Sequence, residues 1–442
     1  MDKKKYFCFG YLVNTQHMEK LKISIIGAGS GYTSELVEEL VKQHQILPVD
    51  ELILYDIDRD RLQIMADFCK RYVTSVKSGL KITIATELIQ AIEDVRFIDV
   101  QIRVGGNRQR VLDEKIPLKY GMLGQETTGV GGMMKAFRTI PVMLEIARMV
   151  EKHNPRAWII NYTNPTGLVT EAITKYTKAK IAGLCSGGLF PKWWTSKALG
   201  AQQSDVDYSY VGLNHMNFAY NLTIKGNPVS EVDFDKILEV SNHGEIDVDL
   251  MKKLRLIPSP YLQYFFHRSR KIAGLMQKPT TRGEDILIIE DEVFKQFSDP
   301  HQLTKPEALA KRGGGGYSEV AINVMKAIYT NNPQKIIVNV PNSGAIGFLP
   351  DDAVVEIPCH VNTAGIVPLV VKDIPQTTWG LIAAVKNYEQ LAVEAAVQGS
   401  KDLAELALLA HPLVGDYDII KPLLQEMFEA NTQYIKLKSS FA

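Results

Sequence analysis

Two residues whose side chains can bind metal, Cys185 and His215, stand 30 positions apart. Cys185 closes the apolar run 180–185, at a predicted strand end, where open α/β sheets bind their ligands. His215 lies in a strand-like segment that can fold back over the sheet edge. A thiolate and an imidazole would form a soft two-ligand site open to substrate oxygens, which suits a divalent transition metal. From the spacing alone, Cys185 could instead be a small buried thiol and His215 a structural histidine.

A glycine-rich turn follows the first strand-like run, KISII, and precedes a helix-like run that begins at Tyr32. Its spacing is G-x-G-x-G, and Tyr32 stands where the third glycine of a dinucleotide turn is expected. Such a turn lets a pyrophosphate approach the backbone and the helix N-terminus. Asp56 ends the next strand and is placed to hold the ribose hydroxyls of NAD. The alternative is that the glycines form only a tight turn and that Asp56 is a solvated surface residue. The predicted NAD-binding residues are Gly27, Gly29, Ser30, Gly31, Tyr32 and Asp56.

The elements that position these residues alternate strand and helix through the first half of the chain. Strand runs separated by helix-length crossovers predict a parallel, doubly wound sheet. After about residue 200 the segment 206–226 indicates paired antiparallel strands, and later segments are mainly helical. We therefore expect an α/β fold, with a Rossmann-like sheet and an α+β substrate or oligomerisation domain, similar to lactate and malate dehydrogenases. The expected boundaries are an extension over 1–20, the NAD-binding domain over 21–200 and the C-terminal domain over 201–442.

The composition describes a globular chain without a strong overall charge. Its 442 residues are 45% hydrophobic, and 50 basic residues balance 50 acidic ones, so no global field favours nucleic acid or an anionic membrane. Four scattered cysteines show no paired spacing, which argues against a disulfide framework and favours a reducing compartment. We find no signal-peptide core and no run long enough to span a bilayer. The expected location is the cytoplasm.

Several motifs taken together resemble glycoside hydrolase family 4, the NAD- and metal-dependent glycosidases, and most closely its 6-phospho-β-glucosidases. They span about residues 22–359 in order, which is most of the chain. The motifs are IIGAGSGYT, IRVGGNRQRVLDEKIPLKYGMLGQETTG, NYTNPTG, the cysteine with GLNH, PYLQYF, RGGGGYSEVA and VPNSGAIGFLPDDAVVEIPC. This family is an NAD-dependent exception to glycoside hydrolysis by two carboxylates.

The resemblance implies a reaction that oxidises and then re-reduces the sugar. NAD would take hydride from carbon 3, a base would remove the acidified proton on carbon 2, the aglycone would leave, water would add and the hydride would return. The resemblance assigns the metal, manganese or another divalent ion, to Cys185 and His215, where it would polarise the sugar oxygens. It assigns the base to Tyr261, with Tyr264 as the competing residue and a structural wall role as the alternative for either.

Substrate-binding residues are predicted from their hydrogen-bonding chemistry. Asn161 and Asn164 end another predicted strand, and an asparagine amide can both donate to and accept from sugar hydroxyls. Arg103 and Arg282 can clamp a phosphate or hydroxyl, because a guanidinium offers paired donors to an oxyanion. Arg282 is our choice for the phosphate. Arg312 is of the same type, and a solvated surface role is the alternative for each arginine.

The residues after Cys185 depart from the family pattern. The resemblance implies an asparagine with a nearby proline in β-specific members and an aspartate in α-specific ones, whereas Ser186, Gly187 and Gly188 stand here. The missing acid favours β-linkages and leaves protonation of the leaving group unassigned. The alternatives are a 6-phospho-α-glucosidase or other family glycosidase, a plain NAD-dependent dehydrogenase and a non-catalytic sugar-phosphate-binding relative. The expected partners are a phosphorylated disaccharide or glycoside and further copies of the chain, as a homodimer or homotetramer.

Overall fold

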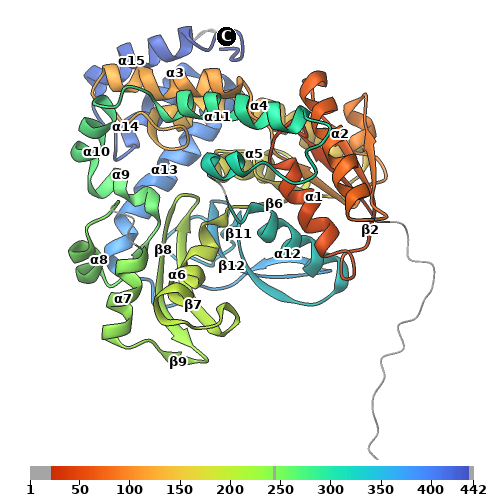
Figure 1. Cartoon of the computed structure of the whole chain (residues 1–442). Helices are drawn as coiled ribbons and strands as arrows, with labels where there is room; N and C mark the ends of the chain where they lie inside the picture. Colours follow the sequence, from red (N-terminus) through yellow and green to blue (C-terminus); the bar gives the residue numbers. More distant parts are fainter. Residues whose placement is uncertain (1–20, 242–244, 314, 438–442) are drawn as a thin grey trace, which may run out of the picture.

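The computed structural model describes residues 21–241, 245–313 and 315–437. The predicted extension over 1–20 lies outside these residues. The fold is built around one mixed sheet, with helices on both faces (Figure 1).

Six strands of this sheet are parallel and run in the order β3-β2-β1-β4-β5-β6. This is the strand order of dinucleotide-binding sheets, in which the order reverses next to β1. Their apolar runs are buried on both faces, as the parallel pattern predicts. The strands are β1 (Leu21–Ile26), β2 (Val49–Tyr55), β3 (Lys81–Ile84), β4 (Phe97–Val100), β5 (Trp158–Asn161) and β6 (Lys180–Gly183).

Three strands from the second half of the chain extend the same sheet. β11 (Gln334–Pro341) pairs antiparallel with β6, β12 (Val354–Asn362) pairs with β11, and β13 (Gly365–Pro368) completes the edge. The antiparallel extension was not predicted from the sequence. It connects the strand that precedes Cys185 to segments more than 150 residues later, since Asn339 pairs with Gly183.

Helices from both halves of the chain cover this sheet. One layer contains α4 (Gly129–His153), α5 (Thr166–Tyr176) and α13 (Gln376–Gln398), which contact one another. On another side α1 (Thr33–Lys42) contacts α12 (Tyr317–Thr330), and α12 also covers β11 and β12. The prediction that the later segments are mainly helical is confirmed for α12 and α13.

A smaller antiparallel sheet contains β7 (Val206–Leu213) and β8 (Met216–Ile224), with β10 (Ile257–Pro258) and β9 (Asn227–Pro228) beside β8. The predicted antiparallel pair is confirmed, and only two residues connect β7 to β8. The other helices are α2 (Arg59–Ser75), α3 (Gly106–Lys119), α6 (Phe190–Leu199), α7 (Glu231–Ser241), α8 (Val248–Leu254), α9 (Gln263–Phe266), α10 (Arg268–Met276), α11 (Arg282–Ser298), α14 (Lys401–Ala410) and α15 (Tyr417–Glu429). Among the described residues no helix is both long and apolar enough to cross a membrane.

A buried carboxyl group with an unpaired oxygen lies in the centre of the main sheet. Asp99 on β4 is 1% exposed, stands between β1 and β5, and its Oδ1 has no hydrogen-bond partner in the described structure. Burial raises its pKa to about 8. A buried, unpartnered polar group of this kind lowers the stability of the fold.

At low pH, where the carboxyl is protonated in both states, we expect Asp99→Val to stabilise the protein by about 1–3 kcal/mol, because it removes an unsatisfied polar group from a strand. The folded pKa lies above that of the unfolded chain, so the folded protein retains a proton that the unfolded chain has released. The stability of the wild type therefore falls as pH rises from about 4 to about 8, through the values of the two states. Unfolding midpoints measured at pH 5 and pH 8 should show the larger gain at pH 8.

Asp99→Asn is the matched control, since it keeps the size and the unpartnered polar group but cannot ionise. The asparagine variant should not lose the extra stability that the wild type loses at high pH. Its stability should rise less than that of the valine variant. Unfolding midpoints of Asp99→Val that equal those of the wild type at both pH values would contradict this account.

Candidate functional site

The glycine turn lies between β1 and α1, as predicted. Gly27 has φ +91°, and a Cβ there would stand 2.9 Å from the backbone of Gln101, so only glycine fits without strain. The Asp56 carboxylate lies against this turn, where Oδ2 accepts from the N–H of Gly29 at 2.8 Å. The turn and its carboxylate thus form a strand-turn-helix unit whose geometry fits a dinucleotide.

The segment around Arg312 lies over this turn. The Tyr32 hydroxyl donates to the Gly313 carbonyl at 2.6 Å, and the Arg312 guanidinium lies 4.6 Å from the centre of the Tyr32 ring. Arg312 also pairs with Glu290 at 3.1 Å and is largely buried. Tyr317 contacts the rings of both Tyr32 and Tyr162 edge to face. Residues before α12 therefore close one side of the predicted cofactor turn.

Cys185 follows β6 at the carboxyl end of the main sheet and begins a short 3₁₀ turn, Ser186–Leu189. Its Sγ accepts from the N–H of Gly187 at 3.4 Å. Burial, and then the charge of Glu356, raises the pKa of the Cys185 thiol to about 12, and hydrogen bonds that include one from the Asn214 side chain oppose the rise. The thiol is therefore protonated until a cation binds beside it.

His215 occupies the two-residue turn between β7 and β8, where its φ is +63°. Its ring stacks on Tyr261, with centroids 3.7 Å apart and planes 4° from parallel. Burial lowers the pKa of His215 to about 3, so its imidazole is neutral, the form that binds metals. Tyr261 comes from the 3₁₀ turn Pro260–Leu262, which directly follows β10.

His215 stacks on Tyr261, and neighbouring groups connect both residues to Cys185. Asn214, which precedes His215, hydrogen-bonds the thiol, and the charge of Cys185 contributes after burial to raising the pKa of Tyr261. Sulfur and nitrogen donors of this kind fit a divalent transition metal. Within the described residues no group of three or more His, Cys, Asp or Glu is placed to hold a metal.

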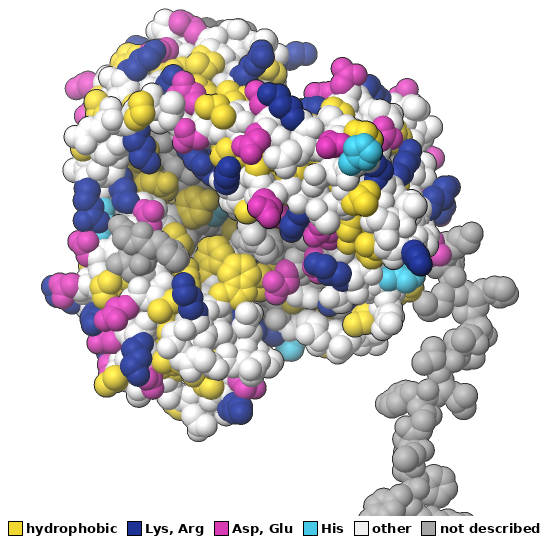
Figure 2. Space-filling view, in the orientation of Figure 1, with side chains coloured by type: hydrophobic (Ala, Val, Ile, Leu, Met, Phe, Trp, Pro, Cys, Tyr) yellow, Lys and Arg dark blue, Asp and Glu magenta, His cyan; other side chains and the backbone are white. Residues whose placement is uncertain are grey.

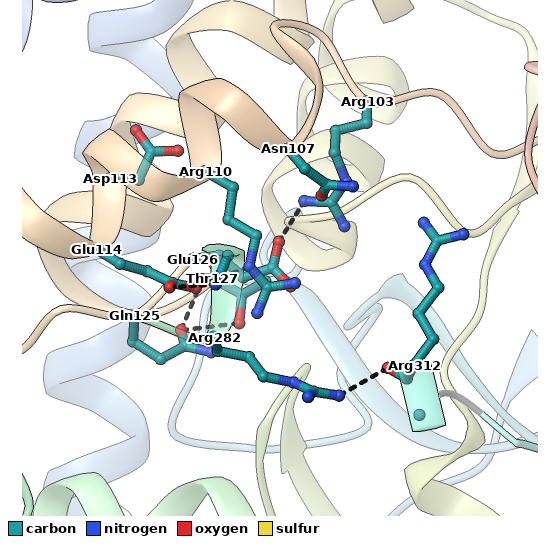
Figure 3. A network of polar contacts seen from close by, with 12 residues as sticks. Arg103, Asn107, Arg110, Asp113, Glu114, Gln125, Glu126, Thr127, Arg282 and Arg312 are labelled. Carbon is teal, nitrogen blue, oxygen red and sulfur yellow. Dashed lines mark hydrogen bonds and ion pairs between the residues drawn. The ribbon is translucent and has the colours of Figure 1, made fainter. Parts of the chain in front are cut away.

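Glu126, which precedes the His215 contact Thr127, connects several cations (Figure 3). Its carboxylate pairs with Arg103, with Arg110 at 2.9 Å and with Lys135 at 2.8 Å. Although burial alone would raise the pKa of Glu126, the three cations hold it well below its usual range. Burial and the charge of Arg103 lower the pKa of Lys135 to about 7. Arg110 also pairs with Glu114 at 2.7 Å, so the cluster holds three basic side chains and two carboxylates. This small excess of basic groups suits an anionic ligand.

The predicted substrate residues have different surroundings. Asn161 is fully buried, and its amide is hydrogen-bonded to the backbone of Thr163. Asn164 is half-buried, with one contact, at 3.4 Å, to the Thr166 N–H. Arg282 is exposed at the start of α11, and its guanidinium donates to the carbonyls of Lys311 and Arg312 (Figure 3). Asn164 and the two arginines Arg103 and Arg282 thus keep polar groups available, whereas Asn161 supports its own turn.

A hollow is visible on the face of the molecule shown in Figure 2. It lies between the upper helices and the region of β7 and β8, in the orientation of Figure 1. Hydrophobic side chains line its floor, and Lys, Arg, Asp and Glu side chains surround it. A sugar ring with a charged substituent matches such a lining, because its faces are apolar and its rim is polar.

Sequence reasoning missed residues that support the site rather than form it. Thr127 contacts the His215 ring at 3.0 Å, and Glu126 organises the cations. Glu356 on β12 is 1% exposed and accepts hydrogen bonds from Tyr210, Asn214, Asn217 and Asn339. A charged residue in the apolar run VVEIPC was the one signal that could have identified it.

Two family models match the chain. The model for family 4 glycosyl hydrolases matches residues 22–191, and the model for the C-terminal domain of the same family matches residues 210–414. The 6-phospho-beta-glucosidase BglT of Thermotoga maritima is 38% identical over 94% of this chain and 100% of its own. The 6-phospho-beta-glucosidase of Escherichia coli is 34% identical over 94% of this chain and 96% of its own.

Solved structures of 6-phospho-beta glucosidases also resemble this chain. The Thermotoga maritima 6-phospho-beta glucosidase with NAD and glucose-6-phosphate has a TM-score of 0.90 and 37% identity, covering 95% of this chain and all of its own. A second structure of that enzyme contains manganese, NAD+ and glucose-6-phosphate, with a TM-score of 0.88 over the same shares of the two chains. A malate dehydrogenase of Plasmodium falciparum, 16% identical with a TM-score of 0.54 over 85% of this chain and 99% of its own, shares the fold. The predicted fold class is therefore confirmed.

Proposed function

Because this chain belongs to the family 4 glycosyl hydrolases, we propose that it hydrolyses 6-phospho-β-glucosides to glucose 6-phosphate and the aglycone, using NAD and a divalent metal such as manganese. The observation that carries the proposal is the stack of the His215 imidazole on the Tyr261 ring, beside Asn214, whose side chain hydrogen-bonds the Cys185 thiol. A thiol, an imidazole and a phenol together suit metal-assisted removal of a proton, and a simple dehydrogenase has no need of this set.

When bound, NAD would supply a reversible hydride acceptor for carbon 3, and the metal would supply a Lewis acid for the sugar oxygens. Cys185 and His215 would hold the metal. Tyr261, which contacts the metal-binding histidine, would take the proton from carbon 2. The glycine turn and Asp56 would orient the nicotinamide cofactor. Each of these roles belongs to a residue that the sequence predicted.

The proposed preference for β-linkages depends on Ser186, Gly187 and Gly188. No carboxylic acid follows Cys185 in this turn, so an acid placed there for an α-linked leaving group is missing. The 6-phospho-β-glucosidases named above also match at 34–38% identity. Hydrolysis of α-linked substrates is the second candidate, because a 6-phospho-alpha-glucosidase structure matches with a TM-score of 0.85.

For the sugar phosphate we propose Arg282, with Arg103 and Asn164 toward the sugar hydroxyls. Arg282 donates to two backbone carbonyls through one nitrogen, so its other donors stay available to a phosphate. Arg103 approaches the same region but already pairs with Glu126. Asn161, which the sequence also suggested, would act by shaping the turn that carries Asn164.

A chromogenic substrate tests the proposal. With NAD, Mn²⁺ and a thiol reductant, a nitrophenyl 6-phospho-β-glucoside should release nitrophenol without accumulation of NADH. Build-up of NADH would indicate a dehydrogenase, and binding without turnover would indicate a sensing protein. The α-linked and the unphosphorylated glucosides, tested in parallel, determine the anomer and the need for phosphate.

We also propose a cytoplasmic protein that assembles as a homodimer or homotetramer. The cysteines Cys69, Cys185 and Cys359 are free thiols, as a reducing compartment requires. Light scattering on the purified chain would measure the number of subunits.

A further inference from the structure

We propose that Thr127 is a positioning residue that fixes the tautomer of His215, so that Nε2 is the nitrogen offered to the metal. The inference depends on the metal site of the proposed function. It stands on three contacts that join Gln125 and Thr127, which are two positions apart, to His215, which is 88 positions further along the chain. Figure 3 shows Gln125 and Thr127.

The first contact fixes the orientation of the Gln125 amide. The backbone N–H of Thr127 points at the Gln125 side chain, 2.6 Å from Oε1. An N–H can only donate, so the atom that it meets must be the carbonyl oxygen and not the NH₂ group. Gln125 therefore presents an acceptor to Thr127.

The second contact fixes the hydroxyl proton of Thr127. Its Oγ1 lies 3.1 Å from the same Gln125 oxygen, which is an acceptor. The single proton of the hydroxyl must lie on this contact for it to be a hydrogen bond. The hydroxyl oxygen then has only lone pairs for its other neighbour.

That neighbour is the Nδ1 atom of His215, 3.0 Å from Oγ1. Both contacts of the hydroxyl are satisfied only when Nδ1 carries the proton and donates to Thr127. A neutral imidazole has one N–H, so Nε2 keeps its lone pair. A metal-binding histidine commonly donates its other N–H to such a partner, which fixes the ring and its tautomer.

The backbone around Thr127 holds this arrangement in place. α4 begins one residue after Thr128, and a Cβ at Gly132 in its first turn would stand 2.5 Å from the Thr127 carbonyl carbon. Glycine at this position lets the 125–128 segment rest directly on the helix. On the other side of His215, the stacked Tyr261 ring limits tilting of the imidazole.

The test compares three threonine variants. Thr127→Val keeps the shape but removes the hydroxyl, and it should weaken Mn²⁺ binding about 10–100-fold, the usual effect of losing such a partner. Thr127→Ser should restore the wild-type affinity. Thr128→Val is the matched control, because the hydroxyl of Thr128 makes no capping hydrogen bond. Binding is measured on the full chain with NAD present, from the electron paramagnetic resonance signal of free Mn²⁺.

The tautomer itself gives a second measurement. Nitrogen-15 spectra of histidine-labelled, metal-free protein, assigned with His215→Gln, should show a protonated Nδ1 and a free Nε2 in the wild type and a mixture in Thr127→Val. Wild-type Mn²⁺ affinity in Thr127→Val, or the opposite tautomer in the wild type, would overturn the inference. A wild-type chain that binds no Mn²⁺ but shows the expected tautomer would overturn the metal site of the proposed function instead, so the two failures are distinguishable.

Discussion

Cys185→Ser is expected to lose more than about 100-fold in Mn²⁺ affinity and, with it, nearly all glycoside turnover. The sulfur is one of two protein donors at the proposed site, and removing a ligand costs more than the 10–100-fold typical of a supporting residue. A serine hydroxyl is a harder and weaker donor than a thiolate. NAD binding should stay within about twofold of wild type, because the glycine turn lies on β1 and not on β6. Metal and NAD titrations of the same preparation measure both effects.

Cys69→Ser is the matched control for this variant. Cys69 is a fully buried thiol on α2, so the same atom is exchanged in a comparable environment away from Cys185. It should keep the wild-type affinity for Mn²⁺. Equal loss of Mn²⁺ and NAD binding in Cys185→Ser would show misfolding, and full activity with bound Mn²⁺ would remove Cys185 from the metal site.

Tyr261→Phe is expected to reduce turnover by about 10²–10⁴-fold, the contribution of a positioned general base. The phenyl ring can keep the stack on His215, so the geometry of the metal site should persist and Mn²⁺ affinity should change little. The specific readout is exchange of the carbon 2 proton with solvent deuterium. This exchange should disappear in the variant, because no group remains to remove the proton.

Tyr264→Phe provides the comparison. Tyr264 lies 6.3 Å from Tyr261, ring to ring, and makes no stack with His215. Its loss should leave proton exchange intact. Exchange that persists in Tyr261→Phe but disappears in Tyr264→Phe would transfer the role of base to Tyr264.

The strands and helices of the first half of the chain could be predicted because their signals are local. Runs such as KISII and KIAGLC are apolar and β-rich, and the helices between them carry apolar faces. The pairing of β11 with β6 could not be predicted in this way. An apolar run such as QKIIVNV indicates a strand, but its partner is chosen by packing between segments more than 150 residues apart.

The residues of the site divide in the same way, into those with a local signal and those that depend on distant contacts. Cys185 and Tyr261 carry chemistry in their side chains, and the family resemblance pointed to them. Thr127 and Glu356 act through hydrogen bonds to partners far along the chain, so their sequence neighbours say nothing about their contacts. Even for His215 the sequence suggested a strand-like segment, whereas the residue occupies a tight turn with positive φ.

The pairing of β11 with β6 has a consequence for synthesis of the protein. While the ribosome adds residues 184–333, the β6 edge that lies beside Cys185 has no neighbouring strand in the nascent chain. Uncovered sheet edges are templates for association with other chains. We therefore expect dependence on chaperones during translation, and aggregation of nascent chains released before β11 emerges, because the last strands of the sheet are made after Cys185.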